Sequence, residues 1–509
     1  MLTALQGLYP ELIVCTAAIV VLIADILMPV KRPLVWVAGA GLLAAFWATT
    51  RQYDPMVNLV LFDRMVVVDS LTHFFRSLVL VGSGLVLGMS ASFPGIPDRR
   101  RGAFYAMLLF ATLSMMLMAM SNDLLMLFLT IEFLGIASYI LVGFTRDQLV
   151  SSEGAVKYFL VGAFSSAIML YGMTLLYGLA HSTNLYDLSE WYRGYSGGPN
   201  AALLTAAIFF VLVGFGFKIA MVPFHMWVPD VYQGAPTPVT AFLAVASKAV
   251  GMAVLLRTFL VGLPAPVGVL AVLAAVTMTV GNLLAIPQRN VKRLLAYSSI
   301  GHVGYVLMGF VASQAAARAM GGYGNGALAA DLGLQGVLVY LAGYLVMNIG
   351  AFTVVMAVAN RTSGEDIEHF SGLSQRDPAL AYLMTLFLLS LAGIPPTVGF
   401  LAKFYVIGAA IQSKLVWLAV VAGLNSAIAL YYYFRIVHQM FFVAPHPASS
   451  HPLPQGEGRG EGRGLGSGLR SDFGGVGWIL GLTAGLVLGL GMFPEALANL
   501  VRGPLVWLN

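Results

Sequence analysis

The chain has 509 residues, of which 59% are hydrophobic and only 10% are charged. This composition excludes a soluble globular domain, and apolar stretches of about 20 residues, the length that crosses a bilayer as a helix, recur from end to end. The net charge of +5 does not indicate nucleic-acid binding, because in a membrane protein the positions of basic residues matter more than their sum. The one cysteine, Cys15, excludes an intrachain disulfide, a cysteine-ligated iron–sulfur cluster and a four-cysteine zinc site.

The apolar pattern predicts an all-α polytopic membrane protein with about fourteen transmembrane helices. The expected spans are residues 11–29, 33–50, 71–93, 103–120, 122–144, 151–180, 202–227, 236–260, 265–286, 292–312, 330–360, 379–411, 415–442 and 474–497. No basic region precedes the first one, so we expect a retained span and not a cleaved signal peptide. The seventh and the twelfth spans are long and are broken by proline.

The basic residues divide unevenly between the two sides of the predicted bundle. Most of the 27 Lys and Arg residues lie in loops that follow odd-numbered spans. These loops are therefore expected in the cytoplasm, and both termini are expected outside. Four bases remain at membrane depth, all of them lysines: Lys157, Lys218, Lys248 and Lys403.

Residues 445–475 differ in kind from the rest of the chain. They are rich in Gly, Pro, Ser and Arg and show no apolar period. We expect a disordered cytoplasmic loop at 443–473, between the last two spans. Arg-Gly strings can indicate RNA binding, but a tolerated loop insertion is the favoured interpretation.

An acid and a base occupy neighbouring apolar spans. Glu132 lies in the fifth span and Lys157 in the sixth. An ion pair between them would lower the cost of burying each group. Two interpretations stay open: a salt bridge that only positions two helices, or a switch in which breaking the pair changes the affinity of the lysine for its proton.

The stretch from 214 to 248 (GFGFKIAMVPFHMWVPDVYQGAPTPVTAFLAVASK) combines three basic groups with a helix break. Lys218 precedes Pro223, and His225 follows Lys218 by about two helical turns. The next helix delivers Lys248. Burial disfavours the charged form of a lysine, so Lys218 can load and release a proton near neutral pH, which an arginine could not. A kinked helix with a merely paired lysine is the alternative, but ionisable groups in a membrane are costly, which favours an ion path.

The twelfth span (LAGIPPTVGFLAKFYVIGAA) has the same combination in reverse order. Pro395 and Pro396 break the helix, and Lys403 follows the break. Two interrupted helices five spans apart indicate two inverted five-helix repeats, spans 4–8 and 9–13. His302 in the tenth span can relay a proton, although a lone histidine is more often a packing residue. The expected divisions are 1–102 (first three helices), 103–260 (repeat 1), 265–442 (repeat 2), 443–473 (loop) and 474–509 (last helix).

These motifs resemble those of the antiporter-like subunits of respiratory complex I, the proton-pumping NADH:quinone oxidoreductase. The segments PFHMWVPDVYQGAPTPVTAF (Pro223–Phe242) and GIPPTVGFLAKF (Gly393–Phe404) look like the N-type subunits of that family. The M-type, L-type and related Mrp antiporter subunits differ after the PFH-W-PD core, and M-type subunits are expected to carry a glutamate where Lys403 stands. L-type subunits have a long C-terminal lateral helix for which this chain has no room. The resemblance covers the chain up to the 445–475 insertion.

The resemblance also implies a role for each buried ionisable group. Glu132 and Lys157 would be the glutamate of the fifth span and its lysine partner. His225 matches the histidine of the PFH motif, whereas the match of His302 is looser. The implied proton path comprises Glu132, Lys157, Lys218, His225, Lys248, His302 and Lys403.

A subunit of this kind would translocate protons across the bacterial plasma (inner) membrane, coupled to quinone reduction elsewhere in the complex. The chain itself would hold no cofactor and no metal, while NAD, FMN, iron–sulfur clusters and quinone would be bound by other subunits. Its partners would be other membrane-arm subunits, including other antiporter-like subunits, and the lipid bilayer, with no nucleic acid.

Three rival interpretations stay open. An Mrp-type Na⁺/H⁺ antiporter subunit would exchange cations without NADH oxidation. A scaffold whose lysines only tie helices together would lose assembly, but not transport, when the lysines are replaced. A transporter of organic substrates is the most distant alternative, because the sequence shows no aromatic-lined recognition site at the midplane.

Overall fold

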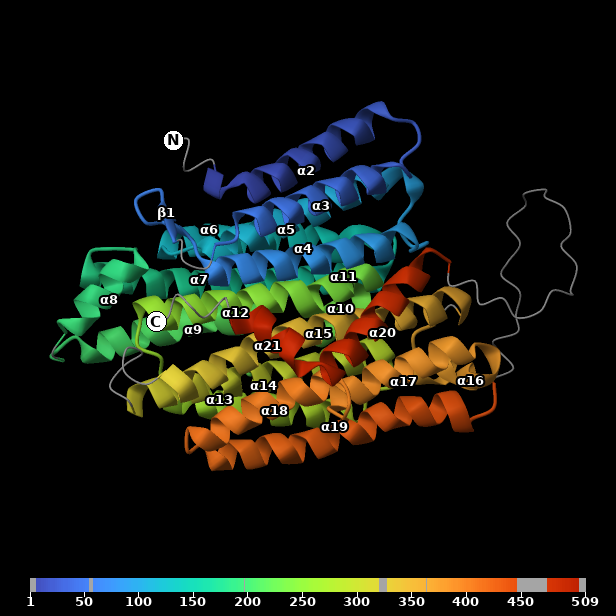
Figure 1. Ribbon diagram of the computed structural model, residues 1–509. Coiled ribbons are helices and arrows are strands. Elements are labelled where there is room, and N and C mark those ends of the chain that lie inside the picture. The colour runs from blue at the N-terminus through green and yellow to red at the C-terminus, as the bar shows by residue number, and fades with distance from the viewer. Residues whose placement is uncertain are drawn as a thin grey trace, which may run out of the picture.

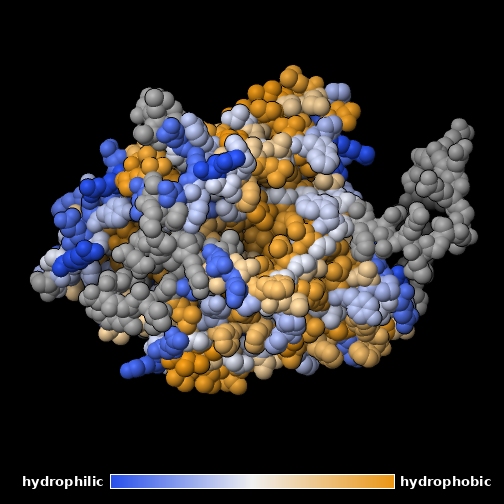
Figure 2. All heavy atoms as spheres, in the orientation of Figure 1, coloured by the Kyte–Doolittle hydropathy of each residue, from blue (hydrophilic) through white to orange (hydrophobic). Residues whose placement is uncertain are grey.

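The computed structural model describes residues 6–54, 58–195, 197–319, 327–362, 364–445 and 474–502. Within these residues, twelve helices are long and apolar enough to cross a membrane. The long helices run roughly parallel to one another (Figure 1), and hydrophilic residues gather at the two ends of the bundle with an apolar band between them (Figure 2). The prediction of a helical polytopic membrane protein is confirmed, with one short β-hairpin in addition.

The N-terminal part of the bundle consists of three helices, α2 (Tyr9–Leu27), α3 (Leu34–Gln52) and α4 (Ser70–Ala91). Between α3 and α4 the chain forms an antiparallel hairpin of β1 (Leu59–Leu61) and β2 (Val66–Val68). The sequence did not predict this hairpin, because strands of three residues are too short to show an alternating pattern. Helix α4 begins where the Asp69 side chain accepts the amide of Thr72, which satisfies a free donor of the first turn.

The first half of the central bundle contains α5 (Arg101–Met120), α6 (Leu124–Val142), α7 (Leu149–Ala180), α8 (Leu185–Arg193), α9 (Ala201–Ile219), α10 (Val228–Gly234), α11 (Thr237–Phe242) and α12 (Lys248–Arg257). Helix α8 is short and lies between two of the predicted spans. The eighth span runs from Thr237 to Gly262, and π-helical turns flank α12 at Leu243–Ser247 and Thr258–Gly262. Wide turns of this kind are frequent next to functional groups, and here they border the helix that carries Lys248.

The second half contains α13 (Val267–Ala285), α14 (Val291–Ala319), α15 (Ala327–Thr362), α16 (Leu373–Arg376), α17 (Pro378–Ala392), α18 (Val398–Gln412) and α19 (Val416–Phe442), followed by α20 (Gly477–Met492) and α21 (Pro494–Arg502). Short 3₁₀ turns occur at Asp98–Arg100, Gly143–Thr145, Ile367–Phe370 and Gly474–Val476. The predicted span 474–497 is wrong in one respect, because a new helix starts at Pro494. Except for its first three residues, the loop predicted at 443–473 lies outside the described residues.

Both predicted helix breaks are present. Helix α9 ends before Ala220, whose φ of 65° is left-handed, and α10 begins at Val228. Helix α17 ends before Gly393, with φ 89°, and α18 begins at Val398. The predicted twelfth span is therefore two shorter apolar helices that pack on each other. A Cβ at Gly399 would lie 1.8 Å from the carbonyl oxygen of a residue in α17, so this contact requires glycine.

The centre of the bundle is formed by the helices whose apolar stretches are most completely buried. These are the eighth span, α14 and α15, whereas α2, α3, α7 and α19 leave much of their apolar surface on the outside. Helices α14 and α15 pack against α18, so the second break adjoins the most buried part of the molecule. The fold thus places both breaks beside buried helices that carry ionisable groups.

Candidate functional site

Lys218 lies in the last turn of α9, directly before the first break. Its side chain is buried, with 2% exposure. The helix ends because Ala220 turns left-handed, and the amides of Ala220 and Met221 bond back to the carbonyls of Phe217 and Gly216. This position puts the ammonium near the negative end of the helix dipole, which favours a cation.

The backbone around the break is held by side chains from elsewhere in the fold. The indole nitrogen of Trp227 donates to the carbonyl oxygen of Phe217 at 3.2 Å, and the amide of Val222 donates to Oγ1 of Thr277 in α13 at 3.2 Å. Tyr158 of α7 stacks on Trp227, with 4.3 Å between the ring centroids. These contacts hold the break without a bond from the Lys218 ammonium.

Helices α9 and α12 approach closely at Lys218. A Cβ at Gly251 of α12 would lie 3.3 Å from Cγ of Lys218 and 2.8 Å from Cγ2 of Ile219. Glycine at this position lets the helix that carries Lys248 pack directly on the end of α9. Glu132 of α6 is the charged group whose field acts on Lys218.

Lys248 is the first residue of α12 and bonds to the second half of the bundle. Its ammonium donates to Oγ of Ser299 in α14 at 2.6 Å and lies 5.4 Å from the centroid of the Tyr232 ring. Both contacts lower the cost of burying a charge. A cavity of about 20 Å³, enough for one water, is lined by Lys248, Ser299 and His302 among other side chains. The three side chains therefore border one small space, whose lining is mostly apolar.

His302 of α14 is held between two tyrosines. Its Nδ1 lies 2.7 Å from the hydroxyl of Tyr340 in α15, and its Nε2 lies 3.2 Å from the hydroxyl of Tyr433 in α19. The Tyr433 hydroxyl also bonds Ser298. Because each hydroxyl can donate or accept, the ring can change tautomer without losing a partner, as a proton relay requires.

Lys403 of α18 contacts the end of the other half-helix. Its ammonium donates to the carbonyl oxygen of Ala392, the last residue of α17, at 2.7 Å. That carbonyl is one of those left free where a helix ends, at the negative end of the dipole. The ammonium also lies 4.8 Å from the centroid of the Tyr305 ring, which stacks on the Tyr340 that bonds His302. Aromatic and hydroxyl groups thus connect Lys403 to His302.

His225 lies in the break between α9 and α10. It is 8% exposed, and its Nδ1 has no hydrogen-bond partner among the described residues. The charge of Lys248 acts on the ring, although no direct bond joins the two side chains. His225 is therefore close to the line of buried groups but not a bonded member of it.

The predicted ion pair of Glu132 and Lys157 is not formed. The hydroxyl of Ser166 donates to the Glu132 carboxylate, whereas the Lys157 ammonium lies 2.7 Å from Asp230 of α10 and 2.7 Å from Glu153 of its own helix. The expectation that the acid and the base neutralise each other is wrong for this structure, and Asp230 is a site residue that sequence reasoning missed.

The antiparallel register of α6 and α7 explains the difference. Tyr139 packs on Tyr158 at 4.8 Å between ring centroids, and Glu132 meets Ser166. Lys157 therefore lies nine residues along α7 from the level of Glu132, which is about 13.5 Å of helix. Its side chain also points towards the start of α7, away from Glu132, as helical side chains do.

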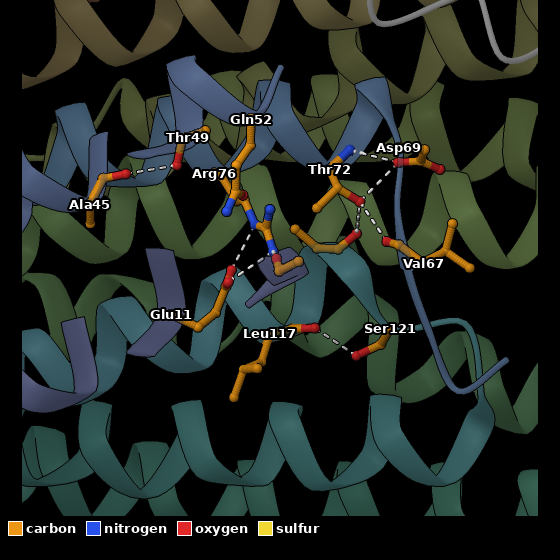
Figure 3. A network of polar contacts seen from close by, with 12 residues as sticks. Glu11, Ala45, Thr49, Gln52, Val67, Asp69, Thr72, Arg76, Leu117 and Ser121 are labelled. Atoms are coloured by element: carbon orange, nitrogen blue, oxygen red, sulfur yellow. Dashed lines mark hydrogen bonds and ion pairs between the residues drawn. The ribbon is translucent and has the colours of Figure 1, made fainter. Parts of the chain in front are cut away.

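Two arginines are as buried as the lysines of the site. Arg76 in the second turn of α4 and Arg257 near the end of the eighth span are 0% and 1% exposed. Figure 3 shows the Arg76 guanidinium facing the Glu11 carboxylate, with bonds of 2.6 and 2.8 Å. Arg257 makes bonds of 2.9 and 2.8 Å to Asp69. Glu11, an acid at the start of the first expected span, was the sequence signal for such a partner.

Asp69, just before α4, ties the N-terminal helices to the eighth span. Besides Arg257, the amide and the hydroxyl of Thr72 donate to its carboxylate, each at 2.8 Å. Burial alone would raise the pKa of Asp69, but the Arg257 charge and these hydrogen bonds hold that pKa below its usual range. The carboxylate is therefore ionised at neutral pH and neutralises Arg257.

No group of three or more His, Cys, Asp or Glu side chains within the described ranges could hold a metal ion. The site instead consists of lysines, a histidine and hydroxyls, buried between two helix breaks. Buried ionisable groups at interrupted helices are typical of polytopic membrane proteins that move small ions. The fold and the site define a protein of that class.

Residues 121–429 match the family model described as NADH:quinone oxidoreductase/Mrp antiporter, TM, and the chain belongs to this family. The NADH-quinone oxidoreductase subunit N of Trichlorobacter lovleyi is 40% identical over 445 residues, which cover 86% of this chain and 88% of that protein. The expected resemblance to antiporter-like subunits of complex I is confirmed.

Two solved structures share the fold. A chain of respiratory complex I from Thermus thermophilus has a TM-score of 0.74 and 28% identity, covering 96% of this chain and 98% of its own. A chain of the Mrp complex from Dietzia has a TM-score of 0.82 and 22% identity, covering 99% of this chain and 97% of its own.

Proposed function

We propose that this chain is a membrane-arm subunit of NADH:quinone oxidoreductase that translocates protons, coupled to quinone reduction in other subunits. The observation that carries the proposal is the line of buried polar groups from Lys248 through Ser299 and His302 to the tyrosines beside Lys403. This line leads from α12, the helix that packs on the end of α9 at the first break, to the second break. The kinship with proteins named subunit N supports the same function.

The proton route starts at Lys218, which passes its proton to Lys248 on the helix that packs against it. Ser299 and a water in the adjoining cavity carry the proton on to His302. From His302 the tyrosine hydroxyls and further water lead to Lys403 at the second break. Each of these groups is buried, so the proton moves from one group to the next and does not escape to solvent on the way.

Control of Lys218 comes from charges at its side of the bundle. The field of Glu132 acts on Lys218, and a change in the charge of Glu132 moves the Lys218 proton towards Lys248. Lys157 acts on the neighbouring helix α10 through its ion pair with Asp230, and it does not contact Glu132. His225 lies beside the route, where it responds to the charge on Lys248.

The arrangement in the membrane follows from the same proposal. The twelve long spans, the broken α17–α18 helix and the shorter α20 make fourteen crossings. Spans 4–8 and 9–13 form inverted repeats, one around each break. Both termini lie on the outer side of the bacterial inner membrane, and NAD, FMN, iron–sulfur clusters and quinone belong to other subunits of the complex. Neighbouring antiporter-like subunits and lipid cover the exposed apolar faces.

An Mrp-type antiporter subunit is the second candidate function, because the Dietzia chain has the higher fold similarity. The whole family shares this fold, so the higher identity to complex I and to subunit N relatives decides against it. The two functions differ in one observable. Transport by a complex I subunit requires NADH oxidation, whereas an independent antiporter exchanges cations without NADH.

The test compares two lysines of the second break region in NADH-respiring membrane vesicles. Lys403→Met removes the buried ammonium that binds Ala392, whereas Lys414→Met removes an exposed lysine just after α18. We expect proton pumping and NADH oxidation to fall in the first variant and to stay at the parent level in the second, with equal assembly. Parent-level pumping by assembled Lys403→Met complex would overturn the proposed route, and transport that ignores NADH would favour the antiporter.

A further inference from the structure

Asp230 joins three helices through a single carboxylate. It lies in the first turn of α10, its Oδ2 is 2.7 Å from the Lys157 ammonium of α7, and its Oδ1 is 2.5 Å from the Arg293 guanidinium of α14. Arg293 also donates to the side chain of Gln233 at 3.1 Å, which adds a second bond to α10. Two cations from different helices therefore converge on one acid.

The three helices are those that carry the proposed proton route. Helix α10 follows the break directly, so its position is linked to His225 and to the end of α9. Helix α14 carries Ser299 and His302 six and nine residues after Arg293, or about 9 and 13.5 Å along a stiff helix. Asp230 is thus linked through α14 to Ser299 and His302 on one side of the Lys248 cavity, and through the break to Ile219 of α9 on another.

Lys157 has a second carboxylate partner of a different kind. Glu153 lies one turn earlier on α7 at the same 2.7 Å, but its side chain is 55% exposed, against 30% for Asp230. An exposed pair within one helix contributes little and moves with its own helix. The ion pair with Asp230 joins α7 to α10, whereas the pair with Glu153 stays within α7. Of the two pairs, only the one with Asp230 connects the charge of Lys157 to the helix that follows the break.

We propose that Asp230 is a positioning residue of the coupling switch, which holds α10 between Lys157 and Arg293 until Lys157 is drawn away. The Lys157 side chain is 44% exposed, so charge from a neighbouring subunit can reach it. When Lys157 leaves, Asp230 keeps only Arg293, and α10 shifts relative to α7. This inference rests on the proposed function, and it replaces the expected Glu132–Lys157 pair by a pair that bridges the break.

The experiment measures protons pumped per NADH, coupled NADH oxidation and assembly of the complex in membrane vesicles. Asp230→Asn is compared with Glu153→Gln, which removes the other carboxylate at the same distance from Lys157. We expect Asp230→Asn to lower coupled oxidation by about two- to thirtyfold, the range for residues along a coupling route. We expect Glu153→Gln to match the parent and Asp230→Glu to restore part of the loss.

A double variant separates coupling from a general loss of stability. If Asp230 acts through Lys157, then Lys157→Met/Asp230→Asn is no slower than Asp230→Asn alone, because Asp230→Asn already breaks the pair that Lys157→Met would break. Losses that multiply in the double variant, or equal losses in Asp230→Asn and Glu153→Gln, would overturn the inference.

The inference and the proposed function fail separately. Lys403→Met tests the route itself and does not involve Asp230. If that variant stops pumping while Asp230→Asn matches the parent, the proton route stands and the role of Asp230 is refuted. If Lys403→Met pumps normally, the function fails whatever Asp230 does.

Discussion

Replacing Ser299 by alanine removes the hydroxyl that accepts the 2.6 Å hydrogen bond from Lys248. A hydrogen bond to a charged group contributes about 1.5–3 kcal/mol, so its loss makes protonated Lys248 about tenfold to hundredfold less populated. The adjoining cavity of about 20 Å³ can take a water that replaces part of the bond. We therefore expect the smaller effect, about tenfold.

The assay is NADH oxidation by tightly coupled membrane vesicles, with proton pumping followed in parallel and assembled complex quantified. Coupled oxidation should fall about tenfold in Ser299→Ala, because uptake of the proton by Lys248 becomes limiting. Ser90→Ala is the matched control, since Ser90 is also fully buried but bonds only the carbonyl of Val86 in its own helix. Equal rates in the two variants would refute a proton step at Lys248 and Ser299.

Two further predictions concern packing and charge. Asp69→Asn leaves Arg257 buried without its counter-charge and should destabilise the assembled complex by about 3–5 kcal/mol, measured by thermal dissociation in detergent. Because Arg257 holds the pKa of Asp69 low, the ion pair stabilises the fold at neutral pH and loses that effect as the pH falls through the folded-state pKa of Asp69. The difference in stability between Asp69→Asn and the parent should therefore narrow in acid. A difference that stays constant with pH would contradict an ionised Asp69 paired with Arg257. Gly251→Val drives a side chain against Lys218 and should cost about 1–3 kcal/mol and slow pumping. Gly178→Val meets no neighbouring atom and should change neither property.

The lysines of the site could be found from the sequence because a charge inside an apolar stretch has few harmless explanations. Lys218, Lys248 and Lys403 are all buried at positions next to a break or a bonded partner. The breaks themselves were equally visible, since proline removes a backbone donor and ends a helix. These inferences need only local sequence and the cost of burying charge.

The partners of those charges could not be found in the same way, because a partner depends on packing. Lys157 pairs with Asp230 and not with Glu132, since the register of α6 against α7 separates the predicted pair by more than two turns. Arg76 and Arg257 lie towards the ends of their spans and are nonetheless almost fully buried. Their acids come from distant segments, which no periodicity reveals.

The relay hydroxyls were missed for a related reason. Tyrosines in apolar helices are common as packing groups, and nothing in the sequence distinguishes Tyr340 or Tyr433 from the others. Only their convergence on His302 from α15 and α19 identifies them. His302 has the looser match to the family, yet its hydrogen bonds identify the two tyrosines of the proposed route.

The most direct test of the proton route is the number of protons pumped per NADH by vesicles that carry Lys218→Met or Lys218→Arg, with assembly followed in parallel. Methionine removes the charge, whereas arginine keeps a charge that cannot be given up near neutral pH. If Lys218 transfers a proton, both variants assemble but lose pumping, and NADH oxidation slows with it. If Lys218→Arg pumps at the parent ratio, the lysine serves only as a fixed charge and the route through Lys218 is wrong.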